Sequence, residues 1–135
     1  MSSSTRRGGR RRLGAAEAIR EILRQLTEVS PYIRAAAVVR VSGLTVEALM
    51  PPTIDAERVA AMAAVMLLLG ERITLAMQNG DLDKVYIKGR EGHIILMAIG
   101  QKAVLTVMAS ERASLGLLFV EMQQTAAKLQ RFDFS

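Results

Sequence analysis

The sequence predicts an α+β domain in which a five-stranded antiparallel sheet carries helices on both of its faces. Apolar spacing and turn residues give the element order helix, two strands, helix, three strands, helix. Two of the strand segments, HIILMAI (93–99) and AVLTVM (103–108), are apolar almost without alternation. Strands of this kind need cover on both faces of the sheet, which places helices on each side.

The first part of the chain predicts one amphipathic helix and one β-hairpin. Within residues 15–30, apolar residues recur at helical spacing with charged residues between them, and Pro31 ends the helix. Residues 35–52 then predict two short strands. They join at Ser42 and Gly43 and are closed by two prolines, which no central strand accepts.

The rest of the chain predicts a long helix, a three-stranded meander and a last helix. Asp55 is the predicted N-cap of a helix that continues to about Gln78, before the stop at Asn79-Gly80. Strands follow at 84–88, 93–99 and 103–108, joined by short turns. The last helix covers residues 114–131, with one apolar stripe made of Leu115, Leu118, Phe119, Met122, Ala126 and Leu129.

The positive charge of the chain lies at its start. The formal net charge is +5, from 18 basic and 13 acidic residues. Five of the basic residues form one cluster, which leaves 13 basic against 13 acidic residues elsewhere: Arg6, Arg7, Arg10, Arg11 and Arg12. We predict a disordered Arg-rich tail over residues 1–13, a domain over 14–131 and a short C-terminal tail over 132–135. The Arg-rich tail is interpreted as a solvated leader or as a contact to RNA, DNA or an anionic membrane.

Composition and motifs argue against catalysis and export. The chain has no Cys and a single His, His93, so no thiolate metal site and no familiar nucleophile–base constellation can be assembled. No phosphate-binding loop of the GxxxxGK type precedes a helix, and no apolar run of the secretory kind follows the basic start. We therefore expect a cytoplasmic binding module with no catalytic residue, metal, cofactor or small-molecule substrate.

The central helix is predicted to be apolar on two sides. Residues 59–70 carry no polar side chain, yet this run is too short for a membrane span of about 20 residues. One arc of the helical wheel is predicted to pack on the sheet: Val59, Met62, Ala63, Met66, Leu69, Gly70, Ile73 and Met77. The opposite arc is also apolar, so we expect a second copy of the chain to cover it. A monomer with a scattered apolar surface is the alternative.

An interface for self-association and partner docking is therefore predicted on this second arc and on the edge strand of the meander. From the helix it takes Ala60, Ala61, Ala64, Leu67, Leu68, Glu71 and Leu75. From the strand DKVYIK (83–88) it takes Val85, Tyr86 and Ile87, because a free strand edge needs blunting or a partner. Lys84 and Lys88 could blunt this edge or flank a symmetric pairing, so the register stays open.

The chain resembles a Roadblock domain of the dynein light chain type in its prokaryotic form. The resemblance covers residues 15–131 and is carried by VSGLTVEALMP (41–51), LLLGER (67–72), GDLDKVYI (80–87), VLTV (104–107) and ERASLGL (111–117). One departure is Ser42, where many members carry Asp before the turn glycine. The resemblance implies the profilin-like αββαβββα fold and a homodimer that joins through the third strand, with the long second helices side by side.

Members of this family act as platforms for small Ras-like GTPases, and some activate GTP hydrolysis without inserting an arginine. The resemblance thus implies a non-enzymatic homodimeric regulator or scaffold for such a GTPase, and it gives Arg58 and Arg72 no catalytic role. The alternative is a dimeric adaptor that binds nucleic acid or an anionic membrane through its two Arg-rich tails.

Overall fold

The computed structural model describes the backbone of residues 2–135 and the side chains of residues 14–135. The elements follow the predicted order and lie at α1 (Ser2–Val29), β1 (Ile33–Arg40), β2 (Thr45–Leu49), α2 (Ala56–Ala76), β3 (Lys84–Gly89), β4 (Gly92–Ile99), β5 (Ala103–Ser110) and α3 (Leu115–Leu129). The predicted α+β class is confirmed.

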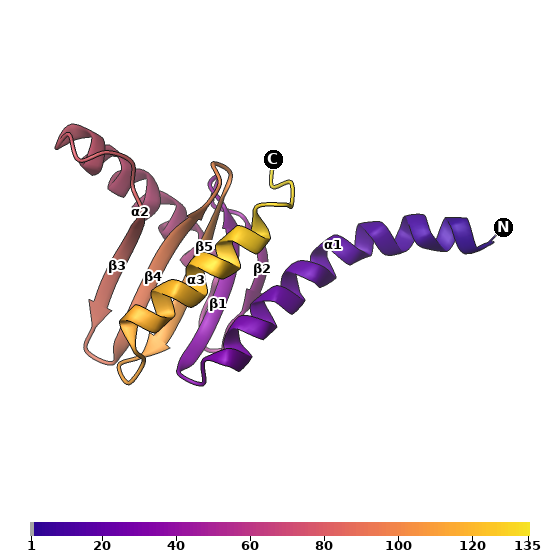
Figure 1. Cartoon of the computed structure of the whole chain (residues 1–135), viewed down its shortest axis with the longest axis horizontal. Helices are drawn as coiled ribbons and strands as arrows, with labels where there is room; N and C mark the ends of the chain where they lie inside the picture. The colour runs from indigo at the N-terminus through magenta and orange to yellow at the C-terminus, as the bar shows by residue number, and fades with distance from the viewer. Residues whose placement is uncertain (1) are drawn as a thin grey trace.

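One antiparallel sheet with the strand order β2-β1-β5-β4-β3 forms the middle layer. The last three strands form the predicted meander, and β1 adds to its inner edge beside β5. This order leaves β2 and β3 as the two outer strands. Helices α1 and α3 lie side by side on one face, while α2 crosses the other face and contacts all five strands (Figure 1).

The core is divided between the two sheet faces. The larger cluster lies under α1 and α3 and includes Leu23, Ile95, Leu105 and Met122, all without measurable exposure. The smaller clusters lie under α2 and are built mainly from alanine and valine, with Leu67 and Leu96 as the largest members. Small side chains of this kind let a helix lie close to a sheet.

Both predicted helix starts are confirmed by their caps. The Asp55 carboxylate accepts hydrogen bonds from the backbone N–H groups of Glu57 and Arg58, at 3.1 and 3.2 Å. Ser114 caps α3 by accepting from the Leu117 N–H. At the other end of α2, Gln78 and Gly80 adopt positive φ angles of 55° and 79°, which ends the helix where the Asn79-Gly80 pair predicts it.

The two ends of the chain differ from the prediction. The backbone is helical from Ser2, where a disordered tail is predicted over residues 1–13, because extending an existing helix costs far less than starting one. The side chains of residues 1–13, including the five arginines, lie outside the described part, so their role stays a prediction. At the C-terminus, Phe134 is buried in the larger core cluster and its carbonyl accepts from Arg40 Nε at 3.2 Å. Residues 132–135 are thus part of the packed domain and not a free tail.

Candidate docking surface on α2 and β3

The sheet-facing side of α2 is made of small residues. Ala60, Ala63, Ala64 and Leu67 are buried, at the spacing of one helical face. The predicted interface residues Ala60, Ala64 and Leu67 are therefore core residues, and that part of the prediction is wrong. Most of the arc predicted to pack on the sheet is exposed instead: Met62, Met66, Leu69, Ile73 and Met77.

Small residues let α2 lie close to the sheet in this orientation. A Cβ on Gly70 would lie only 3.1 Å from side-chain carbons of Leu82 and Val85, whereas one on Gly43 would lie 3.5 Å from the Cα of Ala61, an ordinary contact distance. Larger side chains at the buried positions would hold the helix away from the sheet and leave voids. Because both arcs of α2 are apolar, hydrophobicity does not distinguish them, whereas side-chain size does.

The outward side of α2 is apolar over its whole length. Its exposed large side chains are Met62, Val65, Met66, Leu68, Leu69, Ile73, Leu75 and Met77, with exposed fractions from 40% to 76%. The predicted interface residues Ala61, Leu68, Glu71 and Leu75 are also exposed. Fully burying one such large side chain is worth about 1.5–3 kcal/mol. The prediction that α2 has two apolar sides is confirmed, although the buried side is rotated and takes residues from both predicted arcs.

Length and composition also qualify α2 as a helix that could cross a membrane, the one such helix among the described residues. The twelve-residue apolar run at 59–70 is too short to span a membrane, whereas the whole helix has 21 residues. Its contacts to every strand of the sheet define one side as domain core. Helix α2 therefore has the composition of a membrane span because its outward side is apolar as well as its inner side.

Strand β3 lies beside this surface and has one free edge, since it pairs only with β4 within the chain. Val85 is half-buried and packs under α2 near Gly70, so it serves the core more than an interface. Tyr86 and Ile87 are exposed at 40% and 37%, on opposite faces of the strand. The edge strand thus offers two of its three predicted residues to a partner.

The face of β3 opposite α2 is held by an aromatic cluster. The Tyr86 hydroxyl lies 2.7 Å from His93 Nδ1, and its ring meets Phe119 edge-on at 6.4 Å. The ammonium of Lys84 lies 4.8 Å from the centre of the Phe119 ring and also contacts Asp83. His93 is buried, and its hydrogen bond gives it a structural role that fixes the edge strand.

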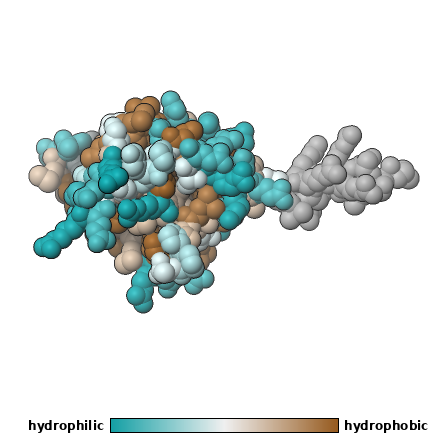
Figure 2. Space-filling model, turned by 90° about the horizontal axis from the view of Figure 1, so that it is seen from below, coloured by the Kyte–Doolittle hydropathy of each residue, from teal (hydrophilic) through white to brown (hydrophobic). Residues whose placement is uncertain are grey.

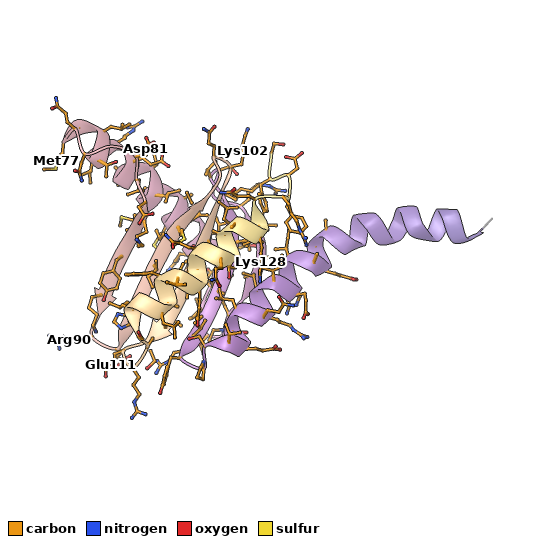
Figure 3. All side chains as sticks on the ribbon, in the orientation of Figure 1. Met77, Asp81, Arg90, Lys102, Glu111 and Lys128 are labelled. Atoms are coloured by element: carbon orange, nitrogen blue, oxygen red, sulfur yellow. The ribbon has the colours of Figure 1, made fainter. Side chains whose placement is uncertain are left out.

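The opposite end of the molecule is polar. Figure 3 places Met77 and Asp81 where α2 ends and Arg90 and Glu111 at the far end of the sheet. A hollow of about 490 Å³ there is lined by Tyr32, Arg34, Glu91, Ser110, Glu111 and Arg112. Figure 2 views this end and shows a mostly hydrophilic surface with scattered hydrophobic residues. Among the residues described, no three His, Cys, Asp or Glu side chains group as metal ligands.

Comparison with known proteins gives one family. The model of the Roadblock/LC7 domain matches residues 19–109. An uncharacterized protein of Methanocaldococcus jannaschii is 30% identical over 98 residues, which make up 73% of this chain and 85% of that protein.

Two solved structures of a protein called MglB share the architecture. MglB of Myxococcus xanthus has a TM-score of 0.80 at 17% identity, covering 86% of this chain and 87% of that one. A structure described as MglB with tetrameric arrangement has a TM-score of 0.77 at 16% identity, covering 87% and 88%. At these identities the likeness shows the fold alone.

Proposed function

Because the chain belongs to the Roadblock/LC7 family, we propose that it is a non-enzymatic homodimeric regulator or scaffold that binds a small Ras-like GTPase in the cytoplasm. The observation that carries this proposal is the apolar outward side of α2. A surface of eight large apolar side chains on one helix exceeds the scattered exposure of an ordinary monomer. Protein partners bury such a surface.

The first partner in this proposal is a second copy of the chain. Two α2 helices related by a two-fold axis would cover part of each other, and the free edges of two β3 strands would pair beside them. The backbone N–H and C=O groups at the open edge of β3 would then form hydrogen bonds, and the apolar outward side of α2 would be buried at the same time. The tetrameric arrangement described for an MglB protein supports self-association of this fold.

The second partner is a small GTPase, which would dock on the joined helices. Support comes from the family resemblance and from the nature of the surface, which is apolar and extends along the whole of one helix. An interface of this kind suits a protein partner more than a small molecule, whose sites are concave. The GTPase would supply its own catalytic groups, while the dimer would position its mobile segments.

The test begins with the mass of the full chain and continues with binding. Each Ras-like GTPase encoded in the source genome would be purified and loaded with GDP or with a non-hydrolysable GTP analogue. We expect a dimer that binds one of these proteins with a preference for one nucleotide state. The rate of GTP hydrolysis with and without the dimer then separates an activator from a scaffold. A dimer that binds none of them in either state would contradict the proposal.

A second candidate rests on the Arg-rich segment. Five arginines within residues 6–12 precede a chain that is otherwise formally neutral. Two such segments on one dimer would bind nucleic acid or anionic lipid with a steep dependence on salt. Deleting residues 1–12 should then abolish binding to RNA, DNA or phosphatidylserine vesicles at low salt. Binding that survives the deletion would exclude this role.

A further inference from the structure

The polar hollow at the far end of the sheet is built by three segments that are distant in sequence. These are the turn between α1 and β1 with the start of β1, the turn between β3 and β4, and the turn that follows β5. Figure 3 shows Arg90 of the second segment and Glu111 of the third at this end of the molecule. The hollow has a volume of about 490 Å³, within the range of about 300–1,000 Å³ that is usual for small-molecule sites. We call it the end hollow.

Backbone contacts hold these segments in place. The Ser110 N–H donates to the Tyr32 carbonyl at 2.8 Å, which joins the first segment to the end of β5. Gly92 packs so closely on β5 that a Cβ there would clash with the Ala109 carbonyl oxygen. The turn between β3 and β4 is therefore fixed beside the end of β5, and it contributes Glu91 to the end hollow. A site whose walls are already in place needs little further ordering when a ligand binds.

Arg34 reaches the end hollow from a bulge in β1. Ile33 pairs with Ala109 of β5 and Ala35 pairs with the adjacent Met108, so Arg34 is one extra residue in the strand. Its two neighbours are buried, whereas Arg34 is exposed and lines the hollow. Bulges redirect a side chain and are frequent next to active sites. The bulge thus brings a guanidinium group to the end of a strand whose other residues serve mainly the core.

Charged groups of both signs line the end hollow without pairing. The guanidinium groups belong to Arg34 and Arg112, and the carboxylates belong to Glu91 and Glu111. The ion pairs between side chains from residue 14 onward involve none of these four groups. Opposite charges that stay apart around one hollow leave room for a ligand that pairs with both.

A buried hydroxyl adds a further polar group to the end hollow. Ser110 is only 8% exposed, and its oxygen accepts from the Arg112 N–H at 3.2 Å. Its own O–H is therefore able to donate to an anionic group. Arginine side chains also donate to such groups, and their paired hydrogen bonds to a carboxylate or phosphate are among the strong ones. The donors of the hollow thus suit an anion, while its two carboxylates suit a cation.

We propose that the end hollow binds a small zwitterion, a molecule with one anionic group and one ammonium group a few bonds apart. The two arginines and the Ser110 hydroxyl would hold the anionic group, while Glu91 and Glu111 would accept from the ammonium. A simple anion would be repelled by both carboxylates, and a simple cation by both arginines. Free α-amino acids and phosphorylated amines such as O-phosphoethanolamine have this chemistry. The site lies within one chain and does not depend on the partner proposed for α2.

The test is a titration of the full chain followed by NMR spectra of the backbone amides. The ligands are glycine and larger α-amino acids, their N-acetyl and methyl ester derivatives, and O-phosphoethanolamine, each at millimolar concentration. The N-acetyl derivative lacks the ammonium and the ester lacks the carboxylate. We expect the amide signals of Tyr32, Arg34, Ser110 and Arg112 to shift with at least one zwitterion. Its affinity should exceed that of either derivative by at least about tenfold, because each derivative loses charge-assisted hydrogen bonds.

Two substitutions and a control test the location of the site. Arg34→Gln should lower the affinity for the zwitterion by about tenfold, since it removes one charged donor. Glu91→Gln should weaken binding of the zwitterion but not of its N-acetyl derivative. Arg90→Gln is the matched control, because Arg90 is an exposed arginine of the same turn that does not line the end hollow. It should leave the affinity unchanged. Unaltered amide signals outside the hollow would show that each variant is folded.

The outcomes are distinct. N-acetyl derivatives that bind as tightly as the free amino acids would overturn the zwitterion in favour of a plain anion. The proposal would also fail if no zwitterion shifts the signals of the hollow, or if Arg90→Gln loses as much affinity as Arg34→Gln. A stronger response to O-phosphoethanolamine than to any amino acid would support the proposal and identify a phosphate as the anionic group.

Discussion

The outward sides of the two longest helices, α1 and α2, have opposite character, since one is charged and the other is apolar. The outward side of α1 is charged, and Arg24 lies 3.3 Å from Glu21 and 3.8 Å from Glu28. The outward side of α2 presents methionine, valine, leucine and isoleucine between Arg58 and Arg72. Both helices pack on the same sheet, so domain folding explains only their inner sides. The charged outer side of α1 is well solvated and needs no further cover. The apolar outer side of α2 is the feature that the proposed binding to another protein would bury.

The largest effect should separate two neighbouring leucines of α2. Leu67 is 3% exposed under the helix, while Leu68 is 48% exposed on its outer side. Leu67→Ala should lower the free energy of unfolding by about 2–5 kcal/mol, because it leaves a cavity against the sheet. Leu68→Ala should cost much less. Both losses are measured as the free energy of urea unfolding in a chain that also carries Ile73→Glu, a charge on the outward side of α2 that should keep the chain monomeric. Equal losses for the two leucines would mean that the faces of α2 are assigned wrongly.

A smaller effect should appear where the turn between β1 and β2 touches α2. Gly43→Ala places a side chain at a φ of 97° and at 3.5 Å from the Cα of Ala61. Backbone strain of this kind costs about 1–3 kcal/mol. The thermal unfolding midpoint should fall. Gly80→Ala, at a φ of 79° and with open space around it, is the matched control and should lower the midpoint by a similar amount, because a Cβ at 3.5 Å from Ala61 makes an ordinary van der Waals contact and adds no clash. A far larger loss at Gly43 than at Gly80 would contradict the room that the structure leaves between the turn and α2.

The smallest effect should come from the charged side of the comparison. Arg20 on α1 lies 2.7 Å from the Glu47 carboxylate on β2, and its side chain is half-exposed. Exposed pairs of this kind contribute about 0.2–1 kcal/mol and weaken with salt. Arg20→Ala should therefore lower the free energy of unfolding in urea by a small amount, and by a smaller amount at 1 M salt. A loss that matched Leu67→Ala would show that charges, and not apolar contacts, hold α1 in place.

The sequence predicts the element order because each element has its own period and its own stop signal. Asp55 and Ser114 cap helices where expected, and Asn79-Gly80 ends α2. The apolar content of α2 also predicts that one side of the helix stays uncovered within a single domain. These features depend on local sequence alone, and so a single sequence is enough to find them.

The orientation of α2 is not predictable from hydrophobicity, because both of its arcs are apolar. The useful signal is size: the close-packed side collects Ala60, Ala63 and Ala64, and the bulky residues are left outside. Leu44, which is exposed in the turn beside Ala61, is not predicted as part of this apolar surface for a different reason, since a turn residue has no helical period. Phe134 likewise lies beyond the last predicted helix, and only the folded core provides its site.

The central claim is that the outer side of α2 is covered by a second copy of the chain. Sedimentation equilibrium of the full chain at micromolar concentration tests it most directly. The account predicts twice the 14.7 kDa of one chain, and a return to one chain mass for Ile73→Glu. A wild-type chain that sediments at 14.7 kDa across this range would contradict the account.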